Sequence, residues 1–348
     1  MADDYLKALE IELSWLEQPR TVQTLFIGGG TPTHLTEPQL DRLFDALNRW
    51  LPLQSASEVT VECNPSDITP AKLDLLCGRG VTRLSIGAQS FNPDKLRRLE
   101  RNHGPEQVVR AVEMAASRFQ SVSLDLIFAA PNETLESWEQ DLQQATSLGQ
   151  DLQHISTYGL TFEHGTTFWN RRARGELQQL EDSLEAEMYS LAIDHLTANG
   201  FNHYEVSNFA RVGSECRHNM VYWRGEPYFA FGAGAARYIN GRRETNQRST
   251  SSYLKKVLSG ESPIAESEQL SPAAKACEQL IFGLRMMAGV DLDDFQSTTG
   301  FDVDELAGPE VGRFINSGLL ERVASRLRLT RKGLMLSDSI WPELLTHQ

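Results

Sequence analysis

Between residue 5 and about residue 240, short apolar runs alternate with longer stretches in which apolar side chains recur every three to four positions. The short runs predict strands and the longer stretches predict amphipathic helices. Strands are expected at 24–27, 58–62, 83–86, 121–127, 154–160 and 202–206, and helices at 38–51, 70–77, 93–100, 106–119, 135–148 and 180–199. Helices that alternate with strands are typical of parallel β–α units. Because six strands are too few for a closed eight-stranded barrel, the pattern predicts an α/β fold with an incomplete, TIM-like barrel.

The pattern changes from about residue 265. Helices are expected at 272–287, 291–299 and 310–317, followed by a hairpin of 319–323 with 327–330 and a last helix after Gly333. Helices followed by a hairpin resemble a winged helix, so we expect a C-terminal α+β domain over 265–348. The partial barrel would then span 1–240, with a linker at 241–264. Acidic residues are scattered through the C-terminal part, which argues against a nucleic-acid partner.

Net charge and hydropathy narrow the function classes. The formal net charge of -14 disfavours nonspecific binding to nucleic acid or to anionic membranes. No apolar run approaches the roughly 20 residues of a membrane span, and the N-terminal stretch lacks the layout of a signal peptide. A cytoplasmic protein without a membrane span is therefore expected, with peripheral membrane contact left open.

The four cysteines, Cys63, Cys77, Cys216 and Cys277, lie far apart in the sequence. No two of them have the short spacing that metal or cluster ligands usually show, so no metal ligand is assigned in this chain.

Glycines and polar residues gather where the predicted strands end. The first strand runs into Gly28-Gly29-Gly30-Thr31-Pro32, and the second ends in Glu62-Cys63-Asn64-Pro65. The third ends in Gly87-Ala88-Gln89-Ser90, and the fourth carries Asp125 in an otherwise apolar run. A carboxylate inside a buried strand is costly unless it is paired or bound to a ligand. Since parallel strands place these ends at one edge, a ligand-binding face is predicted there.

These motifs, in this order, resemble the radical S-adenosylmethionine (SAM) proteins of the oxygen-independent coproporphyrinogen III oxidase group, and more closely its HemW-type heme chaperones. The resemblance covers nearly the whole chain, through residues 28–32, 62–65, 83–91, 124–131, 154–163, 204–209 and 218–223. It implies a radical SAM partial barrel with a HemN-type C-terminal domain. The stretch Tyr204 to Phe209 matches the chaperones rather than the dehydrogenase branch.

The resemblance also implies a SAM site. Gly29, Gly30 and Thr31 would receive the methionine amino group, and backbone carbonyls suit an ammonium group. Glu62, Gln89 and Asp125 would supply acceptors, and Arg101 would supply a cation for the carboxylate. Two further positions, Gly159 and Ala236, match residues that pack near the adenine.

A heme site is implied by the segment around His218. Residues 216–223 resemble the His-Asn-x-x-Tyr-Trp motif of HemW-type proteins, which assigns His218, Asn219, Tyr222 and Trp223 to heme binding. Neutral imidazole and thiolate are both good ligands for heme iron, and aromatic neighbours offer apolar area to the macrocycle.

The resembling proteins carry a Cys-x-x-x-Cys-x-x-Cys loop for a [4Fe-4S] cluster before their first helix. Here Met1 opens the chain and residues 5–10 already match the helix after that loop, so a cluster is expected only in a complete form of the protein. A misplaced start or a truncated gene model is predicted, because loss of a strand would expose the edge of the strand around Phe26. Ala129 to Glu133 departs from the usual Gly-Leu-Pro-x-Gln, and Ala230 and Ala236 replace a frequent glycine and histidine.

Three functions follow from the resemblance. The first is a heme chaperone that binds heme and SAM and delivers heme to an acceptor protein. The second is an oxygen-independent coproporphyrinogen III oxidase, and the third is a clusterless, degenerate paralogue. No catalytic residue is assigned.

Overall fold

The computed structural model describes residues 1–162 and 167–345. These residues divide into two compact units. The first unit contains Met1–Leu25, Pro38–Ser57 and Cys216–Gln348, and the second contains Phe26–Glu37 and Glu58–Glu215. Among the described helices, none is both long and apolar enough to cross a membrane.

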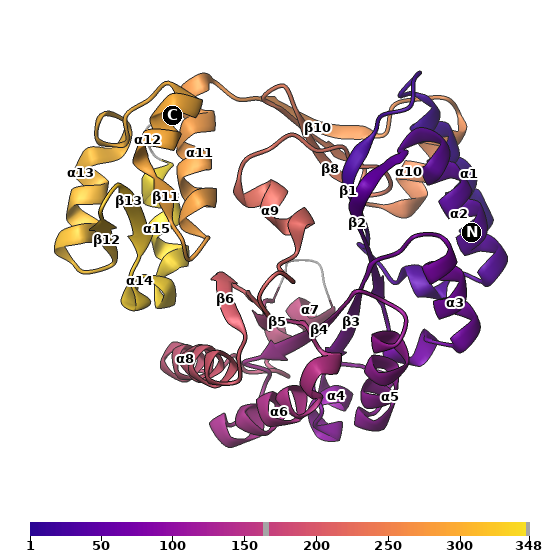
Figure 1. The fold of residues 1–348 in the computed structure, drawn as a ribbon, viewed down its shortest axis with the longest axis horizontal. Helices are drawn as coiled ribbons and strands as arrows, with labels where there is room; N and C mark the ends of the chain where they lie inside the picture. The colour runs from indigo at the N-terminus through magenta and orange to yellow at the C-terminus, as the bar shows by residue number, and fades with distance from the viewer. Residues whose placement is uncertain (163–166, 346–348) are drawn as a thin grey trace. The chain divides into compact units, whose positions relative to one another are not determined.

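A seven-stranded sheet with the order β1-β2-β3-β4-β5-β7-β6 forms the barrel-like part of the fold (Figure 1). Its strands are β1 (Val22–Ile27), β2 (Leu53–Cys63), β3 (Arg83–Gln89), β4 (Ser121–Phe128), β5 (His154–Gly159), β6 (Asn202–Glu205) and β7 (Asn208–Ala210). Neighbours from β2 to β5 pair in parallel, while β7 pairs antiparallel with β5 and with β6. The predicted α/β fold with an incomplete barrel is confirmed.

Helices of the second unit cover the outer face of this sheet, where α4, α5, α6 and α8 lie in Figure 1. The helices of this unit are α3 (Pro70–Gly78), α4 (Pro93–Arg98), α5 (Pro105–Ala116), α6 (Leu135–Ser147), α7 (Thr167–Ala173) and α8 (Asp182–Ala198). Their starts follow local chemistry: the side chains of Thr69, Asn92 and Thr134 each accept a hydrogen bond from a backbone N–H of the first turn. Proline occupies the first helical position of α3, α4 and α5.

The buried side chains of the sheet are apolar towards the helices and largely polar on the inner face. Ser123 Oγ lies 2.8 Å from Nδ1 of His154, and the Tyr204 hydroxyl lies 2.9 Å from its Nε2. Burial lowers the pKa of His154 well below its usual value, so the ring is neutral at physiological pH. Hydrogen-bonded polar side chains such as these therefore line the inner face of the sheet below the carboxyl ends of its strands.

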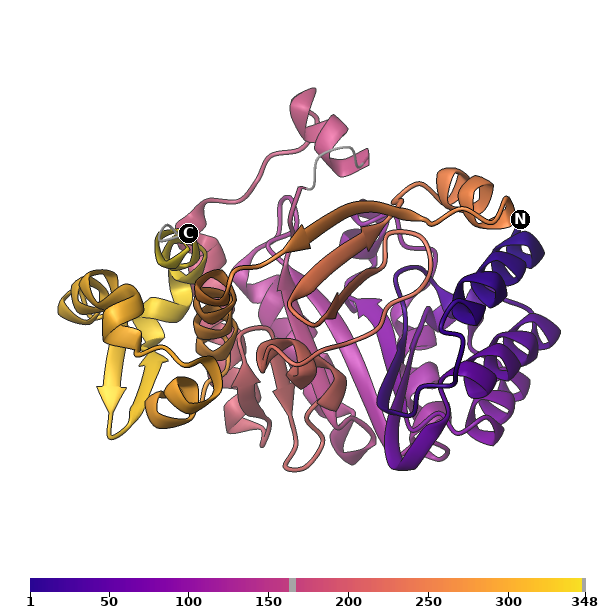
Figure 2. The ribbon, with the colours of Figure 1, turned by 90° about the horizontal axis from the view of Figure 1, so that it is seen from above.

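The first unit joins the N-terminal helix to residues far along the chain. It contains α1 (Ala2–Ser14), α2 (Glu37–Trp50), α9 (Arg217–Trp223) and α10 (Thr250–Leu258). An antiparallel sheet in the order β10-β9-β8 is built from β8 (Ala236–Ile239), β9 (Arg242–Asn246) and β10 (Ile264–Gln269), drawn in orange in Figure 2. Residues 241–264, for which the sequence predicts a linker, thus contain β9, α10 and the first residue of β10.

The C-terminal part of this unit has the predicted helices and hairpin. Its elements are α11 (Pro272–Leu284), β11 (Val290–Asp291), α12 (Leu292–Thr299), α13 (Val303–Asn316), β12 (Leu320–Val323), β13 (Arg326–Leu329), α14 (Arg331–Met335) and α15 (Ser337–Leu344). The hairpin β12–β13 gains β11 as a third antiparallel strand. Helix α13 is interrupted at Ala307, whose backbone is non-helical, just before Pro309, so its second part agrees with the helix expected at 310–317.

Candidate functional site

A cavity of about 400 Å³ opens at the carboxyl ends of β2 to β5, within the second unit. Most of the residues expected to hold SAM line it: Gly30, Thr31, Glu62, Gln89, Arg101, Asp125 and Gly159. Gly29 lies beside them and donates its backbone N–H to Oε2 of Glu62 at 3.1 Å. Ala236 belongs to the first unit, where it is the first residue of β8.

Two of the three glycines after β1 have a physical reason to be glycine. A Cβ on Gly28 would lie 2.6 Å from Cδ of Glu62, so only glycine allows that carboxyl group to approach the strand end. Gly29 has a φ of +76°, a backbone conformation that side chains with a Cβ rarely adopt. Gly30 lines the cavity and has no atom within 4 Å of an added Cβ. The loop therefore combines the close approach of Glu62 at Gly28, a left-handed backbone conformation at Gly29 and an open cavity wall at Gly30.

Two carboxyl groups dominate the electrostatics of the cavity. Burial and the neighbouring charge of Asp125 raise the pKa of Glu62 to about 7. Burial also raises the pKa of Asp125, although the Ser85 hydroxyl, 3.1 Å from both carboxylate oxygens, opposes this shift. Acceptors of this kind suit an ammonium group or sugar hydroxyls, because a bound donor would relieve the repulsion.

Arg101 brings a positive charge to the same cavity. Desolvation lowers the pKa of its guanidinium, and no carboxylate of the described residues counters that shift. A guanidinium in this position suits a bidentate carboxylate ligand. The cavity thus contains both acceptors and a cation, the two kinds of group that pair with the ammonium and carboxylate of an amino acid.

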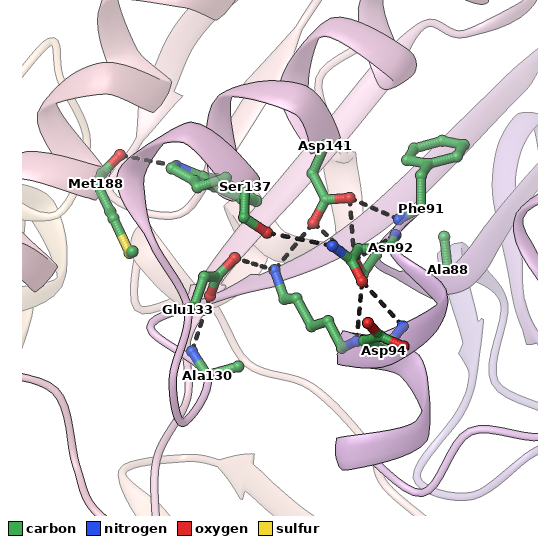
Figure 3. Close-up of polar contacts among 12 residues, drawn as sticks. Ala88, Phe91, Asn92, Asp94, Ala130, Glu133, Ser137, Asp141 and Met188 are labelled. Atoms are coloured by element: carbon green, nitrogen blue, oxygen red, sulfur yellow. Dashed lines mark hydrogen bonds and ion pairs between the residues drawn. The ribbon is translucent and has the colours of Figure 1, made fainter.

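A buried ion cluster holds the loops that follow β3 and β4 (Figure 3). Lys95 of α4 bonds to Glu133, and its Nζ lies 3.0 Å from Oδ2 of Asp141 on α6. The side chains of Lys95 and Glu133 are 0% exposed and that of Asp141 is 2% exposed. Glu133 also accepts the backbone N–H of Ala130 at 2.9 Å, and burial raises its pKa while Lys95 opposes the shift.

The same cluster fixes a strained residue at the cavity wall. Gln89 has a φ of +66°, an uncommon conformation for a residue with a side chain. Directly after it, the Ser90 hydroxyl lies 2.7 Å from Asp141 Oδ2, and the Phe91 N–H donates to Asp141 Oδ1 at 2.7 Å (Figure 3). Surrounding structure must maintain such strain, and Asp141 with Lys95 provides it here.

Several wall residues were not expected from the sequence. These are Ser85, Ile127, Tyr158, Leu160 and Thr161. Ser85 and Ile127 lie two residues from expected positions or strand-end glycines, so the period of two along a strand could have found them. Tyr158 gave no such signal, because its strand, His154–Gly159, mixes polar and apolar residues without a regular alternation. Glu163, the last residue of the matching stretch 154–163, lies outside the described residues.

The residues expected to bind heme lie on α9, in the first unit. His218 and Tyr222 are one helical turn apart, and their rings meet edge to face with centroids 5.2 Å apart. Nε2 of His218 lies 2.8 Å from the Tyr222 hydroxyl, and Nδ1 lies 2.9 Å from Oγ1 of Thr24 on β1. Burial raises the pKa of Tyr222 to about 12, so the phenol keeps its proton at neutral pH.

The other two expected residues, Asn219 and Trp223, also belong to α9. Asn219 is partly exposed on α9. The guanidinium carbon of Arg285 lies over the Trp223 ring, 4.5 Å from the ring centroid. The ring centroids of Trp223 and Phe282 are 6.3 Å apart. Helix α9 therefore carries an imidazole in contact with a phenol and, at its last residue, an indole, and all of its residues are at least partly accessible.

A [4Fe-4S] cluster does not fit the residues present. Within 1–162 and 167–345, no group of three or more His, Cys, Asp or Glu side chains could hold a metal ion. Cys63, Cys216 and Cys277 are buried, and Cys77 is exposed.

Comparisons with known proteins place the chain in a class and then in a family. The model of the radical SAM superfamily matches residues 5–145, and that of the HemN C-terminal domain matches residues 270–336. The solved structure of coproporphyrinogen III oxidase (HemN) from Escherichia coli has the same fold, with a TM-score of 0.86 and 23% identity over 100% of this chain and 84% of that one. The family models and the fold thus place the chain in the radical SAM class.

Curated relatives specify the family. The heme chaperone HemW of Bacillus subtilis (strain 168) is 37% identical over 99% of this chain and 91% of its own length. That of Escherichia coli (strain K12) is 31% identical over 97% of this chain and 89% of its own length. The chain belongs to the HemW family of heme chaperones.

Proposed function

We propose that this protein binds heme through His218 and passes it to an acceptor protein. The observation that carries the proposal is the geometry of α9, where a partly accessible imidazole contacts a phenol in a chain of the HemW family. Histidine is a common axial ligand of heme iron, and the neighbouring aromatic rings can pack against the macrocycle. Asn219, Tyr222 and Trp223 would line the heme next to this ligand.

We further propose that the cavity of the second unit holds SAM. Gly29, Gly30 and Thr31 would surround its amino group, and the carboxylate would bind Arg101. Glu62, Gln89 and Asp125 would accept hydrogen bonds from its hydroxyl and amino groups, while Gly159 would leave room for the adenine. That last role is supported by the position of Gly159 in the cavity wall. Ala236 remains a predicted adenine contact.

When bound, SAM and a cluster supply radical chemistry in the superfamily, but the described residues provide no ligands for a cluster. No step of this proposal passes through it. The residues present account for binding: they orient the amino acid part of SAM and present an imidazole to iron. A cytoplasmic location and an unidentified heme acceptor complete the proposal, with the domain limits near 240 and 265.

A heme-transfer experiment tests the function. Heme-loaded protein is mixed with apomyoglobin, and transfer is followed by absorbance for the wild type and for His218→Ala. His34→Ala is the matched control, because His34 is 60% exposed and pairs with Asp67 in the second unit. We expect the wild type and the control to bind and release heme and His218→Ala to bind it much more weakly. Equal binding by all three proteins would refute the assigned site.

The rival enzyme activity is tested with the same protein. Coproporphyrinogen III and SAM are added under anaerobic, reducing conditions, and the porphyrin products are separated by chromatography. We expect no decarboxylated product. Turnover would support the oxidase function in place of the chaperone.

A further inference from the structure

Both ring nitrogens of His218 are already engaged. Nδ1 lies 2.9 Å from Thr24 Oγ1, and Nε2 lies 2.8 Å from the Tyr222 hydroxyl. A neutral imidazole has one N–H and one lone pair, and an iron ligand must offer the lone pair. The ring as the structure holds it therefore has no nitrogen available to iron until one hydroxyl leaves.

The two hydroxyls differ in how they are held. Thr24 lies on β1, so its short side chain is fixed by a strand. Tyr222 lies on the seven-residue helix α9, where it is the long side chain one turn after His218. Its ring packs edge to face on Tyr228, with centroids 4.7 Å apart. Rotation of the Tyr222 side chain would take its hydroxyl away from Nε2, while Thr24 in its present rotamer keeps its contact with Nδ1.

We propose that Tyr222 caps the Nε2 atom of His218 in the heme-free protein and that Thr24 is the positioning residue that presents Nε2 to iron. This inference rests on the proposed role of His218 as the heme ligand. In this arrangement Nδ1–H donates a hydrogen bond to Thr24 Oγ1. The lone pair of Nε2 then accepts a hydrogen bond from the Tyr222 hydroxyl. Heme binding replaces that one hydrogen bond by a bond to iron, while the bond to Thr24 stays. Metal-bound histidines commonly donate their second N–H in this way.

In the heme-free protein, the Tyr222 hydroxyl competes with other ligands for Nε2, and it competes with iron when heme is bound. Loss of one hydrogen bond of this kind changes a binding constant by about threefold to tenfold. A protein that must release heme gains from such a competing donor, because Tyr222 can return to Nε2 as iron leaves.

Tyr222→Phe tests the cap because it removes the hydroxyl and keeps the ring. We expect heme affinity to rise about threefold to tenfold, measured by absorbance titration. Tyr228→Phe is the matched control, since it removes a neighbouring phenol that has no contact with His218 among the described hydrogen bonds and should leave the affinity unchanged. Weaker heme binding by Tyr222→Phe would overturn the proposal, because it would make the hydroxyl a contributor to binding.

Thr24→Val tests the positioning role. Valine keeps the β-branched shape of the strand residue and removes Oγ1. Heme affinity should fall about tenfold, and Thr24→Ser should restore it. Failure of Thr24→Ser to restore binding would contradict a role through the hydroxyl.

A readout without heme separates the cap from the ligand assignment. Diethyl pyrocarbonate modifies unprotonated imidazole nitrogens, and peptide mass spectrometry gives the rate at His218. We expect faster modification in Tyr222→Phe than in the wild type or in Tyr228→Phe. An unchanged rate would overturn the cap. A faster rate without any change in heme affinity would instead refute His218 as the ligand, which is the proposed function.

Discussion

Glu62 illustrates how one side chain is tuned by its surroundings. Its carboxyl group lies against Gly28, accepts the N–H of Gly29 and feels the negative charge of Asp125. Burial and that charge raise its pKa to about 7, despite the opposing backbone hydrogen bond. The group therefore changes charge in the physiological range.

SAM affinity should consequently depend on pH. Because the pKa is raised, Glu62 is largely protonated below pH 7 and largely ionised above it. The ionised form is the better acceptor for ammonium and hydroxyl donors, so we expect tighter binding as pH rises from about 6 to 8. Calorimetric titration of SAM at several pH values measures the effect. Glu62→Gln should bind more weakly and lose the slope between pH 6 and 8, and a slope that persists in this variant would assign the titration to another group.

The candidate ligand-binding residues at the strand ends were predictable because the signal for them lies in the local sequence. Glycines and carboxylates stand out in the sequence against apolar strands, and the resemblance gave them a shared ligand. Tyr158 and the pairing of Ser85 with Asp125 were not predictable in the same way, since Tyr158 gave no local signal and Ser85 and Asp125 are 40 positions apart.

Among the secondary-structure elements, those with clear periodicity were found and those without were missed. All six predicted strands are present. β7 has only three residues and folds back against β5, so it is too short to show a period. β10 has one partly buried residue followed by five exposed ones, which gives no apolar alternation to recognise.

The cluster of Lys95, Glu133 and Asp141 is a long-range feature that joins α4 to α6. Glu133 and Asp141 lie 38 and 46 positions after Lys95, so no local sequence pattern reveals the cluster. The sequence did mark residues 129–133 as a departure from the related proteins. Their environment shows what Glu133 does: it binds Lys95 and the Ala130 N–H.

Lys95→Met should destabilise the second unit strongly. It leaves two buried carboxyl groups without their cation, which costs about 3–5 kcal/mol in comparable buried pairs. Arg97→Met is the matched control from the same helix, because Arg97 and Asp94 are 73% and 67% exposed and such surface pairs contribute about 0–1 kcal/mol. Urea unfolding followed by circular dichroism compares the two. Similar losses in both variants would contradict the assigned role of the buried cluster.

Across the molecule, Glu12 links the N-terminal helix to residues more than 200 positions away. Its carboxyl group accepts the Gly232 N–H at 2.8 Å, the Tyr253 hydroxyl at 2.8 Å and the Asn246 amide at 2.7 Å. Glu12 is only 3% exposed, and burial raises its pKa. Because its partners are 220 to 241 positions away, no local sequence pattern reveals this link.

Glu12→Leu should therefore lower the stability of the first unit. Three buried donors lose their acceptor, and each unsatisfied group costs about 1–3 kcal/mol. Glu10→Ala serves as the comparison, because Glu10 and Arg42 form a pair with 38% and 39% of their side chains exposed. Thermal unfolding should show a large drop in midpoint for Glu12→Leu and a small one for Glu10→Ala. A small drop for both would mean that the link contributes little.

The two proposed ligand sites belong to different units: the cavity lies in the second, and α9 lies in the first. Motif order predicted both sets of residues. What it could not predict is their hydrogen bonding, because Thr24 and His218 are 194 positions apart. The central claim is that His218 is the heme ligand.

Resonance Raman spectroscopy of the ferrous heme complex tests that claim most directly. Protein labelled with ¹⁵N-histidine should show an iron–histidine stretching band that shifts relative to the unlabelled protein. The band should be absent from His218→Gly and should return when imidazole is added to that variant. An iron–histidine band of unchanged frequency and intensity in His218→Gly would contradict the assignment, because another residue would then hold the iron.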